Sequence, residues 1–163
     1  MSATAFIRIT RPHNAVVAGF TALIGYLVAT GTLTPPSLLL AVVVTLITAA
    51  GNVVNDVYDL EIDRINRPDR PLPAGLITLS GAKAYAAVLF IGGLAAAALT
   101  TTLCFAIALV NSIILVGYAV WLKRTPGIGN VAVAYLTASV FLFGGAFEGI
   151  EGLIQNLSLA TIT

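Results

Sequence analysis

The sequence has 163 residues, of which 58% are hydrophobic and only 9% are charged, with a formal net charge of +1. Soluble domains contain about 25% charged residues, so these charges are too few to cover a water-exposed surface, and a soluble globular protein is excluded. The nearly neutral charge excludes a nucleic-acid partner, and the single cysteine, Cys104, excludes a disulfide within the chain. We therefore predict an all-α, polytopic membrane protein.

Long stretches without charged residues define the predicted spans; they cover 12–55, 84–122 and 125–147. One membrane-spanning helix needs about 20 apolar residues, so these stretches hold two, two and one helices. The turn residues of Gly31–Pro36 divide the first stretch, since proline breaks a helix, and Thr100–Thr102 divides the second. We predict five spans, at 14–31, 37–57, 84–101, 103–122 and 127–147.

The basic residues predict the orientation in the membrane. They precede the first span, separate the second from the third, and follow the fourth; the other connections contain no Lys or Arg. All of them therefore lie on one side, which the positive-inside rule makes cytoplasmic. The prediction places the N-terminus and the 56–83 segment in the cytoplasm and Glu148 and Glu151 on the far side.

An acidic stripe is predicted where the second span ends. In a helix continuing through Asp63, residues advance about 100° each, so the carboxylates of Asp56, Asp59 and Asp63 share one face. Asn55 lies on the same face, and Glu61 lies on the opposite one. Like charges at this spacing repel, and the negative end of the helix dipole adds to the cost. Magnesium, which binds one or two carboxylates together with phosphate oxygens, offsets both costs.

Basic residues near the stripe are candidates for binding a diphosphate. Arg64, Arg67 and Arg70 follow it in a segment that three prolines keep out of a helix. Guanidinium groups suit phosphate oxygens and stay charged. Arg11 and Lys123 lie at the same predicted membrane face and are candidates for the same anion, with the alternative that they only anchor the topology.

These residues resemble a known family. Asn55-Asp56-x-x-Asp59-x-x-x-Asp63 is similar to the first aspartate-rich motif of the UbiA superfamily of intramembrane prenyltransferases. The stretch that follows, to Gly75, resembles the loop after that motif, and Tyr118–Arg124 resembles a later Y-x-x-x-L-K-R-like stretch. The opening R-P-H-N is most similar to the archaeal branch that acts on geranylgeranylglyceryl phosphate.

The resemblance implies the fold, the activity and the site. It implies that 1–163 is a single, C-terminally incomplete domain of a nine-helix bundle, with 56–83 as a cytoplasmic substrate-binding loop. It implies Mg²⁺ as cofactor and transfer of a prenyl group, geranylgeranyl in the archaeal branch, from its diphosphate to the glycerol C2 hydroxyl of geranylgeranylglyceryl phosphate. The implied metal ligands are Asp56, Asp59 and Asp63. The implied diphosphate contacts are Asn55, Arg11, Arg67, Arg70, Lys123 and Tyr118.

The sequence also allows other functions. Within the enzyme class, the acceptor is alternatively an aromatic or quinone precursor, or haem. Outside it, the acidic stripe is alternatively the site of a cation transporter, although arginines beside it would repel a transported cation. The chain is also expected to be inactive alone, as a fragment or one half of an assembled enzyme, because nothing after Lys123 supplies a second aspartate motif.

Overall fold

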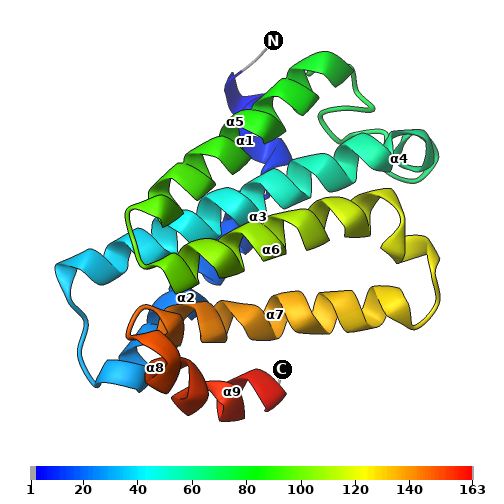
Figure 1. Ribbon diagram of the computed structural model, residues 1–163. Helices are drawn as coiled ribbons and strands as arrows, with labels where there is room; N and C mark the ends of the chain where they lie inside the picture. Colours follow the sequence, from blue (N-terminus) through cyan, green and yellow to red (C-terminus); the bar gives the residue numbers. More distant parts are fainter. Residues whose placement is uncertain (1–2, 163) are drawn as a thin grey trace.

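The computed structural model describes residues 3–162, and this part of the chain contains helices and no strands (Figure 1). The helices are α1 (Ala3–Ile9), α2 (Pro12–Thr30), α3 (Leu38–Tyr58), α4 (Leu60–Asn66), α5 (Leu79–Ala98), α6 (Thr102–Val120), α7 (Ile128–Ala146), α8 (Gly149–Gln155) and α9 (Leu157–Ile162). Two short 3-10 helices are η1 (Pro35–Ser37) and η2 (Leu122–Arg124). The predicted all-α class is confirmed.

Five of the described helices are long and apolar enough to cross a membrane: α2, the η1–α3 unit, α5, α6 and α7. This number confirms the five predicted spans. The ends agree to within three residues, except that α5 begins at Leu79, five residues before the predicted start, where the Thr78 hydroxyl caps it by accepting a hydrogen bond from the Gly81 N–H. Gly31 ends α2 in the left-handed conformation, with φ 74° and its N–H bonded to the carbonyl of Leu27. Thr101 begins α6 because its hydroxyl accepts a hydrogen bond from the Cys104 N–H. The threonines therefore do separate two spans.

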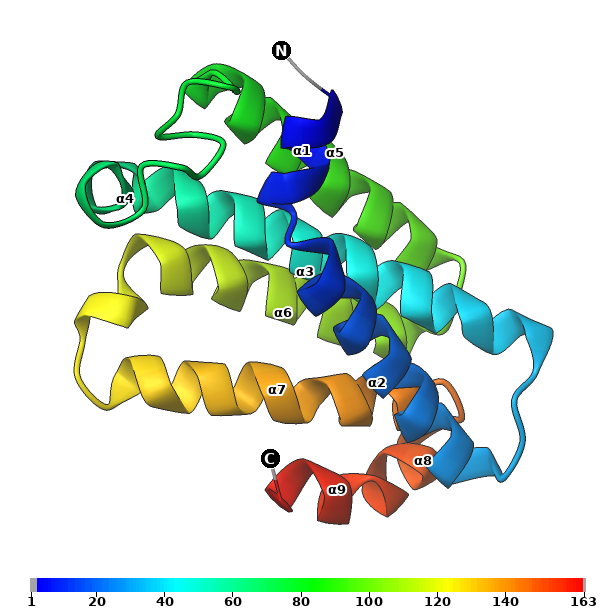
Figure 2. The same cartoon turned by 180° about the vertical axis from the view of Figure 1, so that it is seen from behind.

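The central helix is α3, which packs against α2, α5 and α6 (Figures 1 and 2). One buried apolar cluster joins α2, α3, α5, α6 and α7 around Leu40, Val43 and Phe143. A second joins α1, α3 and α5 around Ile9 and Val53. Since α3 belongs to both clusters, its C-terminal end is held firmly in place.

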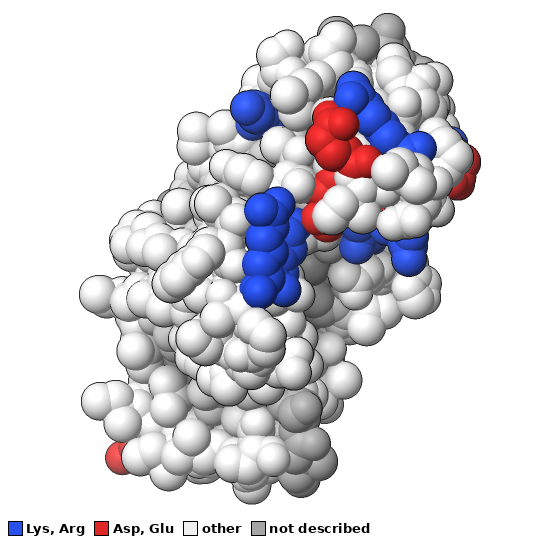
Figure 3. All heavy atoms as spheres, turned by 90° about the vertical axis from the view of Figure 1, so that its right-hand side faces the viewer, with Lys and Arg blue, Asp and Glu red and all other residues white. Residues whose placement is uncertain are grey.

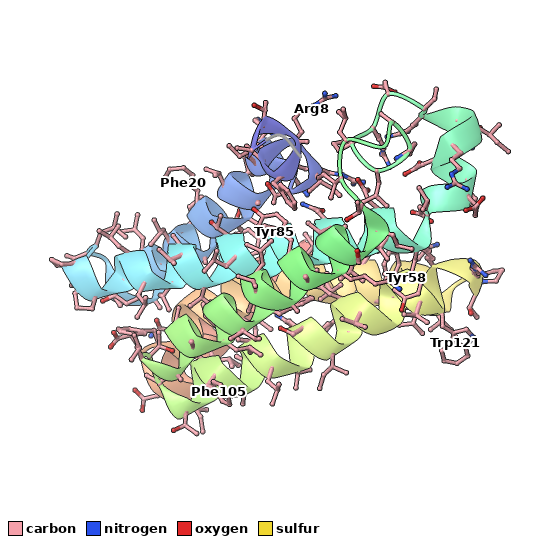
Figure 4. The ribbon with its side chains drawn as sticks, turned by 90° about the horizontal axis from the view of Figure 1, so that it is seen from above. Arg8, Phe20, Tyr58, Tyr85, Phe105 and Trp121 are labelled. Carbon is pink, nitrogen blue, oxygen red and sulfur yellow. The ribbon has the colours of Figure 1, made fainter. Side chains whose placement is uncertain are left out.

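The outer surface of the bundle is apolar, as contact with lipid requires. Large side chains such as Val88, Ile91 and Val131 point outward and are 64%, 67% and 69% exposed. Tyr58 and Trp121 lie at the end of the bundle where α3 and α6 finish (Figure 4). Exposed aromatic rings of this kind are typical of the membrane–water interface.

After α7 the chain turns back, and α8 and α9 pack against α7 (Figure 2). Asn156, between these two helices, is fully buried and donates hydrogen bonds of 2.8 Å to the carbonyls of Gly25 and Phe141. These bonds tie α2 and α7 together. Gly144 of α7 lies directly against the backbone of Ala22 and Tyr26 in α2, so the two helices approach as closely as glycine allows.

Replacing Gly144 by alanine is expected to destabilise the protein by about 1–3 kcal/mol, because the new methyl group overlaps backbone atoms that cannot turn aside. Thermal unfolding in detergent measures the effect. Gly117→Ala in α6 is the matched control, since a methyl group there meets nothing within 4 Å. Equal unfolding temperatures for the two variants would contradict the close α2–α7 contact.

Candidate functional site

The three aspartates of the stripe lie at a break between two helices. The predicted single helix through Asp63 is interrupted: α3 ends at Tyr58, Asp59 has φ −95° and ψ 2°, and α4 begins at Leu60. The helical hydrogen-bond spacing nevertheless continues, from the Asp59 N–H to Asn55 and from the Asp63 N–H to Asp59. Asp56 and Asp63 are therefore both buried, and the Glu61 side chain is 79% exposed on the other side.

Arg70 joins two of these carboxylates. Its Nη1 lies 3.3 Å from Oδ1 of Asp56 and 2.5 Å from Oδ2 of Asp63. Arg11 forms a second ion pair with the same Oδ1 of Asp56. The side chains of Asp56 and Asp63 are only 4% and 8% exposed. Buried carboxylates need such partners, because an unpaired charge in this environment is strongly unfavourable.

The third carboxylate, that of Asp59, pairs with a different cation. Lys123 of η2 places its Nζ 2.6 Å from Oδ1 of Asp59 and 3.4 Å from the amide oxygen of Asn55. The amide nitrogen of Asn55 donates to Oδ2 of Asp59 at 2.9 Å. Asn55 thereby orients both members of the ion pair.

The cations lie on connecting segments at the same end of the bundle. Arg11, between α1 and α2, has a left-handed backbone (φ 50°, ψ 65°), which is unfavourable for a residue with a side chain. Arg70 lies in the turns after α4, where buried Leu72 and Ile77 anchor the segment against the α1–α3–α5 cluster. Figure 3 views this end of the bundle and shows acidic side chains gathered between groups of basic ones.

Two predicted arginines do not join the cluster. Arg64 forms an exposed ion pair with Glu61 at 2.8 Å, on the side away from the aspartates. Arg67 is exposed at the end of α4. Arg64 is turned away because it shares the outer side of α4 with Glu61, whereas Arg67 follows the helix with a non-helical backbone (φ −145°, ψ 60°). The predicted diphosphate contact Tyr118 lines a cavity next to the ion pairs.

This cavity, of about 400 Å³, lies among α2, α3, α6 and α7. Its wall is mostly apolar and includes Val43, Ile47, Leu115 and Val140; its polar groups include Asn14, Asn52, Asn111 and Tyr118. Asn14 lies one turn after Arg11, and Asn52 lies one turn before Asp56, so the cavity adjoins the ion-pair cluster. Sequence reasoning did not find the cavity, because its wall combines residues from four helices whose packing no local pattern reveals.

The aspartates of the stripe can bind a magnesium ion only if they give up their contacts with the basic side chains. In residues 3–162, no group of three or more His, Cys, Asp or Glu side chains is close enough to hold a metal ion. Each of the three aspartates of the stripe is instead paired with a basic side chain. Asp56 and Asp63 nevertheless share the Arg70 guanidinium, and two carboxylates with phosphate oxygens form a suitable ligand set for Mg²⁺.

Comparison with known proteins assigns the chain to a protein family. The model of the UbiA prenyltransferase family matches residues 18–162. The chain is 78% identical over its whole length to the digeranylgeranylglyceryl phosphate synthase of Methanoculleus marisnigri and 55% identical to that of Methanoregula boonei. It spans 58% of the length of each relative.

Two solved structures share the fold. One, from work on digeranylgeranylglyceryl phosphate synthase in membranes, has a TM-score of 0.87 and 39% identity; the match covers 96% of this chain and 59% of that one. The other, an apo UbiA homologue from Aeropyrum pernix K1, has a TM-score of 0.75 and 23% identity, covering 89% of this chain and 56% of that one. These matches and the five apolar helices identify a multi-pass membrane protein.

Proposed function

This chain belongs to the UbiA prenyltransferase family, and we propose that it takes part in magnesium-dependent transfer of a geranylgeranyl group to the glycerol C2 hydroxyl of geranylgeranylglyceryl phosphate. One observation supports this most: paired carboxylates and cations adjoin an apolar cavity of about 400 Å³. The charged end suits a diphosphate, and the cavity suits its hydrocarbon chain. The names of the relatives support the acceptor.

In this proposal Asp56, Asp59 and Asp63 hold the metal. The bound ion would neutralise charge on the diphosphate and so favour its departure. Arg11, Arg70 and Lys123 would contact the phosphate oxygens, where their fixed positive charges stabilise the leaving group. Asn55, already bonded to Asp59 and close to Lys123, would keep these two side chains oriented.

The cavity has a separate role in the proposal. Its apolar wall would bind the geranylgeranyl chain and keep water away from the allylic carbon as the carbon–oxygen bond breaks. The electron pair of that bond leaves with the diphosphate. The acceptor hydroxyl oxygen then bonds to the allylic carbon, and its proton passes to an oxygen of the released diphosphate, which completes the ether.

The alternative of a cation transporter gains no support. All three aspartates are paired with basic side chains at one end of the helices, whereas transporters tend to bind ions near mid-membrane on broken helices. Aromatic, quinone and haem acceptors have no observation in their favour.

Metal removal tests the proposal. Purified protein in detergent is expected to retain radiolabelled geranylgeranyl diphosphate in the presence of Mg²⁺ and to lose it when EDTA is added. In a protein of the relatives' full length, with geranylgeranylglyceryl phosphate present, a radiolabelled ether lipid is the expected product. Equal retention with and without Mg²⁺ would remove the basis for a metal-dependent function.

We also propose that the charged end of the bundle faces the cytoplasm, as the positive-inside rule predicts. Single cysteines at exposed Thr32 and Asp69 are expected to react with an impermeant maleimide from opposite sides of the membrane in oriented vesicles. The native Cys104 is fully buried and gives little background. Labelling of both positions from the same side would contradict the orientation.

A further inference from the structure

We propose that Arg11, Arg70 and Lys123 are exchangeable counter-ions, which makes metal and diphosphate bind interdependently. In the state described here they neutralise the aspartates; when both ligands arrive, they pass from carboxylate to phosphate oxygens. This inference rests on the proposed function of the same site. It adds that neither ligand binds well alone.

The charges of the site balance without any ligand. Three carboxylates meet three basic groups: Asp56 contacts Arg11 and Arg70, Asp63 contacts Arg70, and Asp59 contacts Lys123. The contacts are largely sheltered, since the Arg70 and Lys123 side chains are 18% and 13% exposed. Poor solvent screening makes any net charge added here costly.

This balance disfavours either ligand alone. A divalent cation by itself would compete with the three basic side chains for the carboxylates, and the site would then carry two excess positive charges. A prenyl diphosphate by itself, with about two negative charges on its terminal phosphate and one on the inner phosphate, would meet three carboxylates. When both ligands bind, their opposite charges nearly cancel. Each basic side chain then contacts a phosphate oxygen in place of its carboxylate.

The geometry shows how the exchange would occur. Asp56 lies on α3, a helix shared by both apolar clusters. The three basic residues, in contrast, lie on connections: between α1 and α2, after α4, and in η2. Arg70 contacts Asp56 and Asp63 through one nitrogen, Nη1, so one movement of this guanidinium frees Asp63 and leaves Asp56 paired with Arg11. Arg70 is therefore the residue on which the coupling most depends.

The test is a binding measurement on the purified protein in detergent. Mn²⁺ replaces Mg²⁺ as a probe that accepts the same oxygen ligands, and electron paramagnetic resonance follows the free ion. Inorganic diphosphate is the anion, with a protein-free titration to correct for its complex with Mn²⁺. Saturating diphosphate is expected to lower the apparent Kd for Mn²⁺ by about tenfold, and Mn²⁺ is expected to improve diphosphate binding equally.

Arg70→Gln separates this coupling from simple binding. The variant is expected to bind Mn²⁺ alone about tenfold more tightly than the wild type, because two carboxylates lose a competing cation, and to lose most of the enhancement by diphosphate. Arg11→Gln is expected to change the affinity for Mn²⁺ alone and the enhancement by diphosphate in the same directions but by smaller factors. The reason is that Arg11 contacts one of the described aspartates, Asp56, whereas Arg70 contacts two. It serves as the second variant if Arg70→Gln does not fold.

Arg64→Gln is the matched control, because it removes the same charge from the same segment but from a pair on the opposite side; both affinities should stay unchanged. Arg70→Gln and Arg11→Gln variants that bind Mn²⁺ alone no better than the wild type would overturn the proposal. Wild-type protein that binds Mn²⁺ and diphosphate independently would overturn the coupling and leave the proposed function standing. Failure to bind Mn²⁺ under any of these conditions would overturn both.

Discussion

In a protein of the relatives' full length, replacing Asp56 by asparagine is expected to reduce prenyl transfer by about two to three orders of magnitude, the usual effect of losing one charge-stabilising group at a reacting centre. The amide has the same shape but no negative charge, so it cannot serve as an anionic metal ligand. It also leaves Arg11 and Arg70 without the buried carboxylate that both contact. Turnover of geranylgeranyl diphosphate and Mn²⁺ binding in its presence are the two measurements.

Glu61→Gln is the control for this prediction. It makes the same chemical change five residues along the chain, at a side chain that is 79% exposed and paired with Arg64. Exposed ion pairs contribute about 0–1 kcal/mol, so neither activity nor folding should change appreciably. A comparable loss of activity in Glu61→Gln would show that the site is not confined to the face of Asp56 and Asp63.

The second large effect is expected from filling the cavity. Thr137 of α7 lines it, and a tryptophan there would occupy space that the proposal assigns to the prenyl chain. Excluding about three methylene groups, each worth about 0.8 kcal/mol when buried, would weaken geranylgeranyl diphosphate binding by about fiftyfold. Competition with the radiolabelled substrate measures this affinity.

Binding of inorganic diphosphate to Thr137→Trp should stay at the wild-type level, because the ion-pair cluster is untouched. Val131→Trp provides the steric control: Val131 lies on the same helix, is 69% exposed and is not part of the cavity wall. Equal weakening in both variants, or weakening of inorganic diphosphate as well, would mean that this cavity does not hold the prenyl chain.

The sequence determined those features that depend on neighbours along the chain. The five spans follow from the lengths of the apolar stretches and from the turn residues between them, and the helices end close to the predicted positions. The opposite directions of Asp63 and Glu61 follow from helical periodicity. That periodicity survives the break at Asp59, because its N–H still bonds to the carbonyl of Asn55.

Only the tertiary structure decided which groups meet. Arg11 and Asp56 are 45 residues apart, and Lys123 and Asp59 are 64 apart, so helix packing selects these partners. The same packing leaves Arg64 and Arg67 outside the cluster, although their sequence context is like that of Arg70. The cavity likewise exists only where four helices pack together. Local patterns specify helices and the sides they expose, whereas a buried ion pair or cavity depends on the distance between helices that are remote in sequence.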